Sequence, residues 1–122
     1  MLTPEELESS LNHFSGTEQY HRYNLFGREL LLTDGVEFLV KNAECCWLLD
    51  LILSVQFMPA IKKLDMQFWT LNVNLEKRTA EAICERDSND VVYRQPIPFT
   101  SFPLAEQKIW ISDGVALLPG EY

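Results

Sequence analysis

The sequence predicts an α+β fold in which N-terminal helices pack on a C-terminal antiparallel sheet of four to five strands. Two patterns predict it. Apolar residues recur at helical spacing before about residue 58, and they alternate with polar residues after about residue 65. The chain has 122 residues, of which 47% are hydrophobic and 23% are charged. This composition is typical of one globular domain, which we expect to cover residues 1–122.

The first helix is predicted from its start signal at residues 3–6, TPEE. The threonine can cap the helix, the proline suits its first position, and the second glutamate can complete a capping box. We expect the helix to end at about Ser15, because Gly16 follows. Residues 17–28 show no sustained period and predict a loop, which leads into a short strand at residues 29–32.

Two further helices are predicted before residue 58. Asp34 is expected to cap the first of them, with Glu37 in the capping-box position. Residues 45–57, CCWLLDLILSVQF, form an almost wholly apolar segment interrupted by the single acid Asp50. Apolar residues all round a helix predict burial on every side. A carboxylate there must pair, take a proton or open into a cavity, because an isolated buried charge is very costly.

The second half of the chain predicts an antiparallel meander. Residues 67–75 alternate cleanly, with Trp69, Leu71, Val73 and Leu75 on one face. Further strands are expected at residues 78–85, 91–95, 109–112 and 115–118. Asp113-Gly114 is a two-residue hairpin signal of the type I′ kind. Pro96 and Pro98 predict that the chain leaves the ladder or runs along a sheet edge there.

Charge and cysteine usage restrict the class of protein. Ten basic and eighteen acidic residues leave a net charge of −8, and Lys and Arg form no cluster, so we expect no direct nucleic-acid binding. Net acidity suits a partner with a basic surface. The N-terminus lacks a signal-peptide pattern and residues 45–57 are too short to cross a bilayer, which predicts a cytoplasmic protein without a membrane contact. Three cysteines, Cys45, Cys46 and Cys84, predict buried thiols in a reducing compartment.

No catalytic residue, metal site or cofactor is predicted. Zinc would require four ligands at recognisable spacing, and the sequence has no G-x-S-x-G, Walker A or G-x-G-x-x-G motif. Asp50 is either a general base or binding carboxylate, or a structural acid that pairs with a loop or with an arginine such as Arg22 or Arg28. His21, beside Tyr20, belongs either to an anion or aromatic-ligand site or to a structured loop. Asp34 completes this set of candidate polar residues.

Several segments together resemble one known family. They are Gly16-Thr17-Glu18 with Tyr20 and Arg22, Leu32-Thr33-Asp34-Gly35-Val36, Trp47-Leu48-Leu49-Asp50, Tyr93-Arg94-Gln95, Phe102-Pro103-Leu104 and Leu118-Pro119-Gly120-Glu121-Tyr122. The ordered set is similar to a family of small bacterial proteins of unknown function, found in cyanobacteria and proteobacteria and often on plasmids or phage-related elements. The resemblance implies an accessory protein of mobile or variable gene neighbourhoods. It transfers no activity and no catalytic residue.

The first functional hypothesis is a small, acidic, non-enzymatic protein-interaction module. In its specific form, the protein is an accessory or inhibitory factor from a phage or plasmid that binds a basic host protein surface. Phe99 and Phe102, in a proline-bounded irregular segment, are the candidate interaction surface. The alternative hypothesis is a ligand-binding protein or enzyme with a pocket around Asp50, His21 and Tyr20. A homodimer joined through a strand edge is compatible with both.

Overall fold

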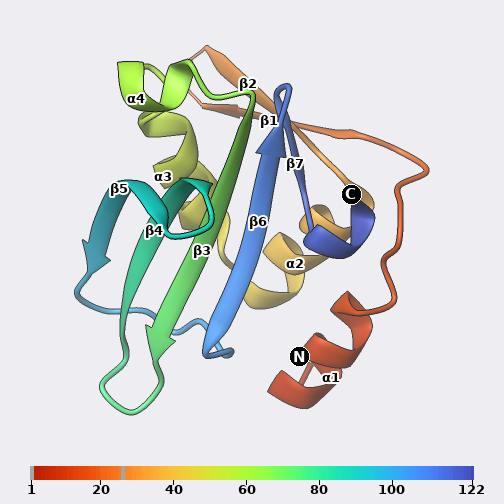
Figure 1. The fold of residues 1–122 in the computed structure, drawn as a ribbon. Helices are drawn as coiled ribbons and strands as arrows, with labels where there is room; N and C mark the ends of the chain where they lie inside the picture. Colours follow the sequence, from red (N-terminus) through yellow and green to blue (C-terminus); the bar gives the residue numbers. More distant parts are fainter. Residues whose placement is uncertain (1, 26) are drawn as a thin grey trace.

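The computed structural model describes residues 2–25 and 27–122, which form one seven-stranded sheet with helices α2 and α3 behind it (Figure 1). The strand order is β1-β2-β7-β6-β3-β4-β5. The elements are α1 (Pro4–Leu11), β1 (His21–Leu25), β2 (Arg28–Leu32), α2 (Asp34–Ala43), α3 (Cys46–Ser54), α4 (Pro59–Lys62), β3 (Met66–Asn74), β4 (Thr79–Asp87), β5 (Asp90–Ile97), β6 (Glu106–Ser112), β7 (Val115–Leu117) and the 3-10 helix η1 (Pro119–Glu121).

Helix α1 begins as predicted and ends earlier. Thr3 is its N-cap, and the Thr3 and Glu6 side chains each accept a hydrogen bond from the other's backbone N–H, which confirms the capping box. The helix stops at Leu11, where the N–H of Asn12 bonds to the carbonyls of Glu8 and Ser10. The chain then turns so that Phe14 can pack against Phe38 of α2, with ring centroids 5.4 Å apart.

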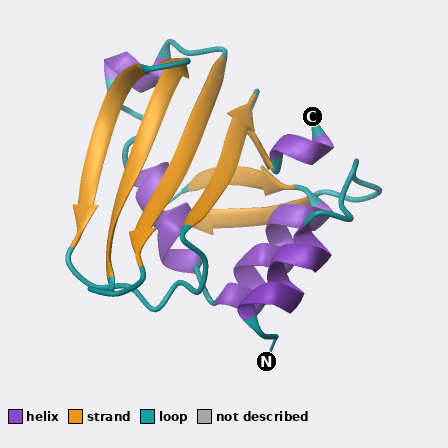
Figure 2. Ribbon diagram, turned by 60° about the horizontal axis from the view of Figure 1, so that its bottom comes forward, coloured by secondary structure: helices purple, strands orange, loops and turns teal. Residues whose placement is uncertain are grey.

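The sheet is larger than predicted, because the N-terminal half contributes two of its strands. Residues predicted as a loop form strand β1, which pairs antiparallel with β2. Strand β2 then pairs with β7 in parallel, with Leu31 opposite Val115. This one parallel pairing joins the β1–β2 hairpin to the C-terminal meander. The predicted α+β class and the strand at residues 29–32 are confirmed, whereas the sheet has seven strands rather than four to five and is not purely antiparallel (Figure 2).

The predicted meander is confirmed in its main features. Trp69, Leu71 and Val73 of β3 are buried on the face that packs against the helices. Leu75 is not part of this row, because the strand ends at Asn74 and Leu75 lies exposed in the turn. The turn at Asp113-Gly114 has the positive φ angles, 50° and 78°, that a type I′ turn requires. The proline-bearing strand β5 is an edge strand, as Pro96 predicts.

Helix α3 is buried on one side only, so the prediction of burial on every side is wrong. Leu48, Leu49, Ile52 and Leu53 lie in the core. Cys46 and Ser54, which are two turns apart on the opposite side, are exposed. Asp50 lies between them and is half-buried. The helix contacts β2 near an edge of the sheet, and only the short strand β1 lies beyond β2, which explains the partial cover.

Candidate functional site

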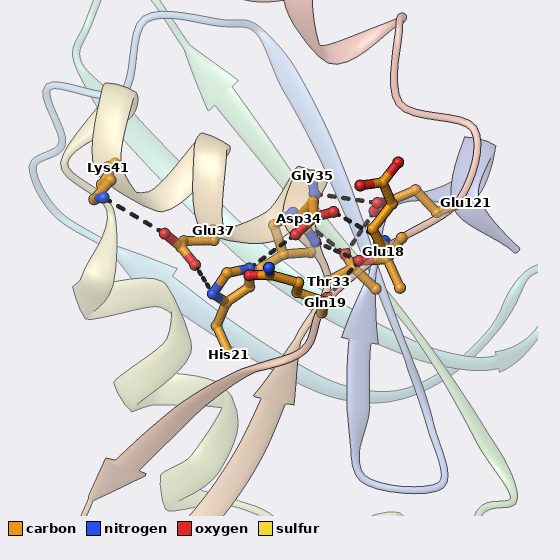
Figure 3. A network of polar contacts seen from close by, with 11 residues as sticks. Glu18, Gln19, His21, Thr33, Asp34, Gly35, Glu37, Lys41 and Glu121 are labelled. Carbon is orange, nitrogen blue, oxygen red and sulfur yellow. Dashed lines mark hydrogen bonds and ion pairs between the residues drawn. The ribbon is translucent and has the colours of Figure 1, made fainter.

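Three segments that are distant in sequence meet at the N-terminus of α2 (Figure 3). Oε1 of Glu121, in the C-terminal η1, accepts from the Thr33 hydroxyl at 2.6 Å and from the Leu118 N–H at 3.0 Å. Its Oε2 accepts from the Gly35 N–H at 3.1 Å. The carboxylate therefore takes up a free donor at the positive end of the helix dipole. Gly35 permits this, since a Cβ there would lie 2.6 Å from Glu121 Oε1.

Asp34 does not cap α2, which corrects the predicted capping box. Thr33 is the N-cap, with extended φ and ψ and a side chain that accepts from the Val36 N–H. Asp34 is the first helical residue, and its carboxylate instead accepts from the Glu18 N–H at 3.0 Å. Its own N–H donates to Thr17 Oγ1 at 2.9 Å. These two bonds fasten the loop before β1 to the start of α2.

His21 lies between two carboxylates on α2. Its Nε2 is 2.8 Å from Asp34 Oδ1, and its Nδ1 contacts Glu37 Oε2, while Lys41 Nζ lies 3.5 Å from the other Glu37 oxygen. The hydrogen bond from His21, with that from the Glu18 N–H, holds the pKa of Asp34 below its usual value. Both ring nitrogens of His21 are therefore engaged by carboxylates of its own chain.

Asp50 is held by a tyrosine that the sequence analysis did not select. The Tyr23 hydroxyl, from β1, donates to Asp50 Oδ1 and also lies 3.4 Å from the Cys46 carbonyl. Burial and the Asp50 carboxylate together raise the pKa of Tyr23 above the usual value of 10.0. The predicted arginine partners lie elsewhere: Arg22 faces Glu29, and Arg28 donates to the Leu53 carbonyl.

The predicted pocket residues Asp50, His21 and Tyr20 are not brought together. His21 contacts α2, Asp50 of α3 accepts from Tyr23 of β1, and the side chain of Tyr20 is 59% exposed. A strand signal at His21–Leu25 would have placed His21 and Tyr23 on one face, because residues two apart in a strand share a face. The face of β1 that holds His21 and Tyr23 lacks a row of apolar residues. The sequence therefore shows no alternation of apolar and polar residues from which this strand could be predicted.

Two of the three cysteines are buried thiols, as predicted, and the third is exposed. Burial raises the pKa of Cys45 to about 12, with a smaller contribution from the neighbouring Cys46. Burial likewise raises the pKa of Cys84 to about 12. A thiol that stays protonated at neutral pH is a poor nucleophile, so neither residue is suited to covalent catalysis.

The sheet has a second face, turned away from the helices, which we call the outer face. Antiparallel partners share a face, and the register gives three rows across β6, β3 and β4. They are Trp110-Phe68-Glu85, Lys108-Thr70-Ile83 and Glu106-Asn72-Glu81. Trp110 packs edge-to-face with Phe68 at 5.1 Å and with Tyr122 at 5.7 Å. An aromatic pair with glutamates and one lysine, Lys108, around it therefore lies on a half-exposed sheet surface.

The predicted interaction pair Phe99 and Phe102 is divided between surface and core. Phe99 is 72% exposed, whereas Phe102 is 1% exposed and belongs to the hydrophobic core. Phe102 is therefore not available to a partner, which corrects that part of the predicted surface. The prolines that bound the segment signalled irregular backbone correctly, but they carry no information on which ring points inward.

The comparisons with known proteins give one match. The profile of a family of unknown function, DUF6876, matches residues 5–122. The chain belongs to that family. No curated protein and no solved structure matches it.

The sequence resembles a family of unknown function, and membership in DUF6876 confirms that part of the resemblance. Three of the segments behind that resemblance, around Thr17, Thr33 and Glu121, are the ones that meet at the start of α2. Within residues 2–25 and 27–122, no group of three or more His, Cys, Asp or Glu side chains is arranged to hold a metal ion. In the same part of the chain, no helix has the length and apolar character needed to cross a membrane.

Proposed function

We propose that this DUF6876 member is a non-enzymatic protein-interaction module that binds a basic partner through the outer face of its sheet. One observation carries the proposal. Phe68 and Trp110 pair edge-to-face on the side of the sheet opposite the helices, where the chain itself leaves them half-exposed. Aromatic side chains of this kind are enriched at the centres of protein interfaces.

The charges around the aromatic pair favour a basic partner. Glu106 and Glu81 flank Asn72 in one cross-strand row, and Glu85 lies beside Phe68 in another. Lys108 lies in the row between them and Arg94 pairs with Glu81 at 3.0 Å, so these three glutamates exceed the two basic residues by one charge. With a net charge of −8 over the whole chain, the long-range field also attracts a cationic protein.

The polar networks support binding rather than catalysis. His21 uses both ring nitrogens on carboxylates of its own chain, and Asp50 is bonded to Tyr23. These groups therefore serve to connect β1 to α2 and α3. An accessory or inhibitory factor of a phage or plasmid, directed at a basic host protein surface, is the biological role that fits this binding mode.

The proposal is tested with two charge-reversed variants that change the net charge equally. Glu81→Lys/Glu106→Lys alters the outer face, whereas Glu5→Lys/Glu8→Lys alters exposed positions at α1. Each immobilised protein is exposed to a bacterial lysate after nuclease treatment and is eluted with a salt gradient. We expect the unaltered protein and the α1 variant to retain the same basic protein, released by salt, and the outer-face variant to lose it.

A third variant, Trp110→Ala, tests the aromatic contribution to the same binding. We expect Trp110→Ala to capture less of the basic protein, with a similar dependence of binding on salt concentration. The substitution removes apolar contact area and no charge. Circular dichroism verifies that each variant is folded. Capture that survives both outer-face variants, or capture lost equally in the α1 variant, contradicts the outer face as the binding surface. The absence of any captured basic protein contradicts the proposal as a whole.

A further inference from the structure

A cavity of about 660 Å³ lies between the C-terminal end of α3 and the turn that joins β6 to β7. Its lining is mixed: Leu30, Leu53 and Ile111 are apolar and buried, and charged side chains, among them Glu29, Lys62 and Asp65, also line it. Its rim includes Arg28, which donates to the Leu53 carbonyl at 3.2 Å and lies 5.2 Å above the Phe57 ring. A volume of this size falls within the range of roughly 300–1,000 Å³ that small-molecule sites occupy.

The lining also contains an unusual polar residue, Gln67. It is 5% exposed and stands in the core-facing row of β3, ahead of Trp69 and Leu71. A buried amide is costly unless its hydrogen bonds are made. Gln67 makes them with a second lining residue, Gln56, which lies in the turn that follows α3. The two side chains form a reciprocal amide pair, with distances of 2.9 and 2.7 Å.

On one side of the amide pair, every hydrogen-bonding group already has a partner within the protein. Trp69 Nε1 donates to Gln67 Oε1 at 2.9 Å, and Gln56 Nε2 donates to the Ile52 carbonyl at 3.0 Å. The indole can only donate and the carbonyl can only accept, so these two contacts fix which atom of each amide is oxygen. With the bonds inside the pair, both lone pairs of Gln67 Oε1 and both hydrogens of Gln56 Nε2 are taken.

The opposite edge has one donor and one acceptor left over. Gln67 Nε2 keeps one N–H and Gln56 Oε1 keeps one lone pair, and these two atoms are 2.7 Å apart. In a planar amide pair the used and unused edges point in opposite directions. Because Trp69 and Ile52 occupy the inner edge and both glutamines line the cavity, the remaining donor and acceptor are directed into it.

We infer that this cavity is a binding site for a small planar molecule that carries a carboxamide or lactam group. The adjacent C=O and N–H of such a ligand match the free N–H of Gln67 and the free lone pair of Gln56. Its apolar body then lies against the apolar part of the lining, which includes Leu30, Leu53 and Ile111. Phe57 and Arg28 at the rim provide a surface on which a ring can stack. The site is independent of the outer face and of the protein partner proposed above.

The inference is tested by titrating ¹⁵N-labelled protein with benzamide and with 2-pyridone while recording amide and indole resonances. We expect saturable shifts of the Gln56 and Gln67 side-chain amides and of the Trp69 indole with both compounds. Ethyl benzoate, which has the ring and an acceptor but no donor, is expected to bind at least roughly tenfold more weakly. Intermolecular nuclear Overhauser effects between the benzamide ring protons and the methyl groups of Leu30 and Ile111 locate the ligand directly.

A matched pair of variants separates the site from general binding. Gln56→Met removes half of the amide edge and leaves the Trp69 bond to Gln67 in place, and we expect a loss of affinity of roughly tenfold or more. Gln107→Met makes the same change on β6, outside the cavity lining, and is expected to leave affinity unchanged. Absence of saturable shifts, equal binding of all three compounds, or equal binding to both variants overturns the inference. The methyl contacts in the unaltered protein decide the matter even if Gln56→Met proves unstable.

Discussion

Glu121 and Gly35 lie so close together that any side chain at position 35 would collide with the carboxylate. A Cβ on Gly35 would be 2.6 Å from Glu121 Oε1 and 2.7 Å from Leu118 Cδ1. The two residues are 86 positions apart in the chain. The hydrogen bond from the Gly35 N–H to Glu121 therefore connects η1 to the start of α2.

Gly35→Ala is therefore expected to destabilise the protein, although alanine normally favours a helix over glycine by about 1 kcal/mol. The added methyl displaces Glu121 and removes a capping interaction of about 0.5–2 kcal/mol, with crowding in addition. We expect a net loss of about 1–2 kcal/mol in urea denaturation. Gly16→Ala is the control, since a Cβ there meets nothing within 4 Å. If Gly35→Ala costs as much in a Glu121→Ala background, the clash is not with Glu121.

The contact between Gly35 and Glu121 could not be predicted from the sequence, whereas the start of α1 could. The capping box of Thr3 and Glu6 is local, because its two residues lie within one turn of the chain. The same holds for the turn at Asp113-Gly114, where positive φ angles restrict the choice of residue. A cap supplied by a residue 86 positions away leaves no local pattern, because it exists only once the sheet has closed.

Asp34 is expected to make stability fall in acid. Its pKa is lowered from the usual value of 3.8, chiefly by the hydrogen bond from His21. The folded state therefore holds the proton less tightly than the unfolded state, so the stabilisation is present above pH 3.8 and is lost as the pH falls through the lower folded pKa. Urea denaturation from neutral pH to about pH 3 should show a shallower acid loss for Asp34→Asn than for the unaltered protein. Identical acid profiles would contradict a role for this carboxylate.

The strand β1 shows why the candidate site was only partly predictable. Its inward residues His21 and Tyr23 bind carboxylates on α2 and α3, so burial there follows polar pairing rather than hydrophobicity. Asp50, which the sequence predicts to need a partner, accepts a hydrogen bond from Tyr23. Its partner could not be identified, because Tyr23 lies in a segment without a periodic pattern, and the nearby arginines were the more obvious choices.

Tyr23 is expected to make stability fall in alkali. Its pKa is raised above the usual value of 10.0 by burial and by Asp50, so the folded state retains the phenol proton longer than the unfolded state. The stabilisation is complete below about pH 10 and is lost as the pH rises further. Tyr23→Phe should remove this part of the alkaline loss and cost about 1–2 kcal/mol at neutral pH, where it leaves Asp50 without its donor. An alkaline profile unchanged by Tyr23→Phe would contradict the assignment.

Asp50→Asn separates a structural from a functional role for this acid. An asparagine can still accept from Tyr23 through its amide oxygen, so we expect the variant to fold with a loss of about 1 kcal/mol or less. Because the proposed interaction uses the outer face, capture of the basic partner should be unaffected. A folded Asp50→Asn protein that no longer binds its partner would instead place the binding surface at α3, on the side that carries Cys46 and Ser54.

The three thiols are expected to react at very different rates. Cys46 is exposed on the open side of α3, whereas Cys45 and Cys84 are buried and have pKa values raised to about 12. Only the thiolate attacks a disulfide reagent, so both burial and protonation slow the reaction of these two. With a thiol-reactive chromogenic disulfide at neutral pH, one equivalent should react rapidly in the folded protein and three after denaturation. Cys46→Ser should abolish the rapid phase, and a rapid phase that persists in this variant would show that Cys45 or Cys84 is accessible through opening of the core.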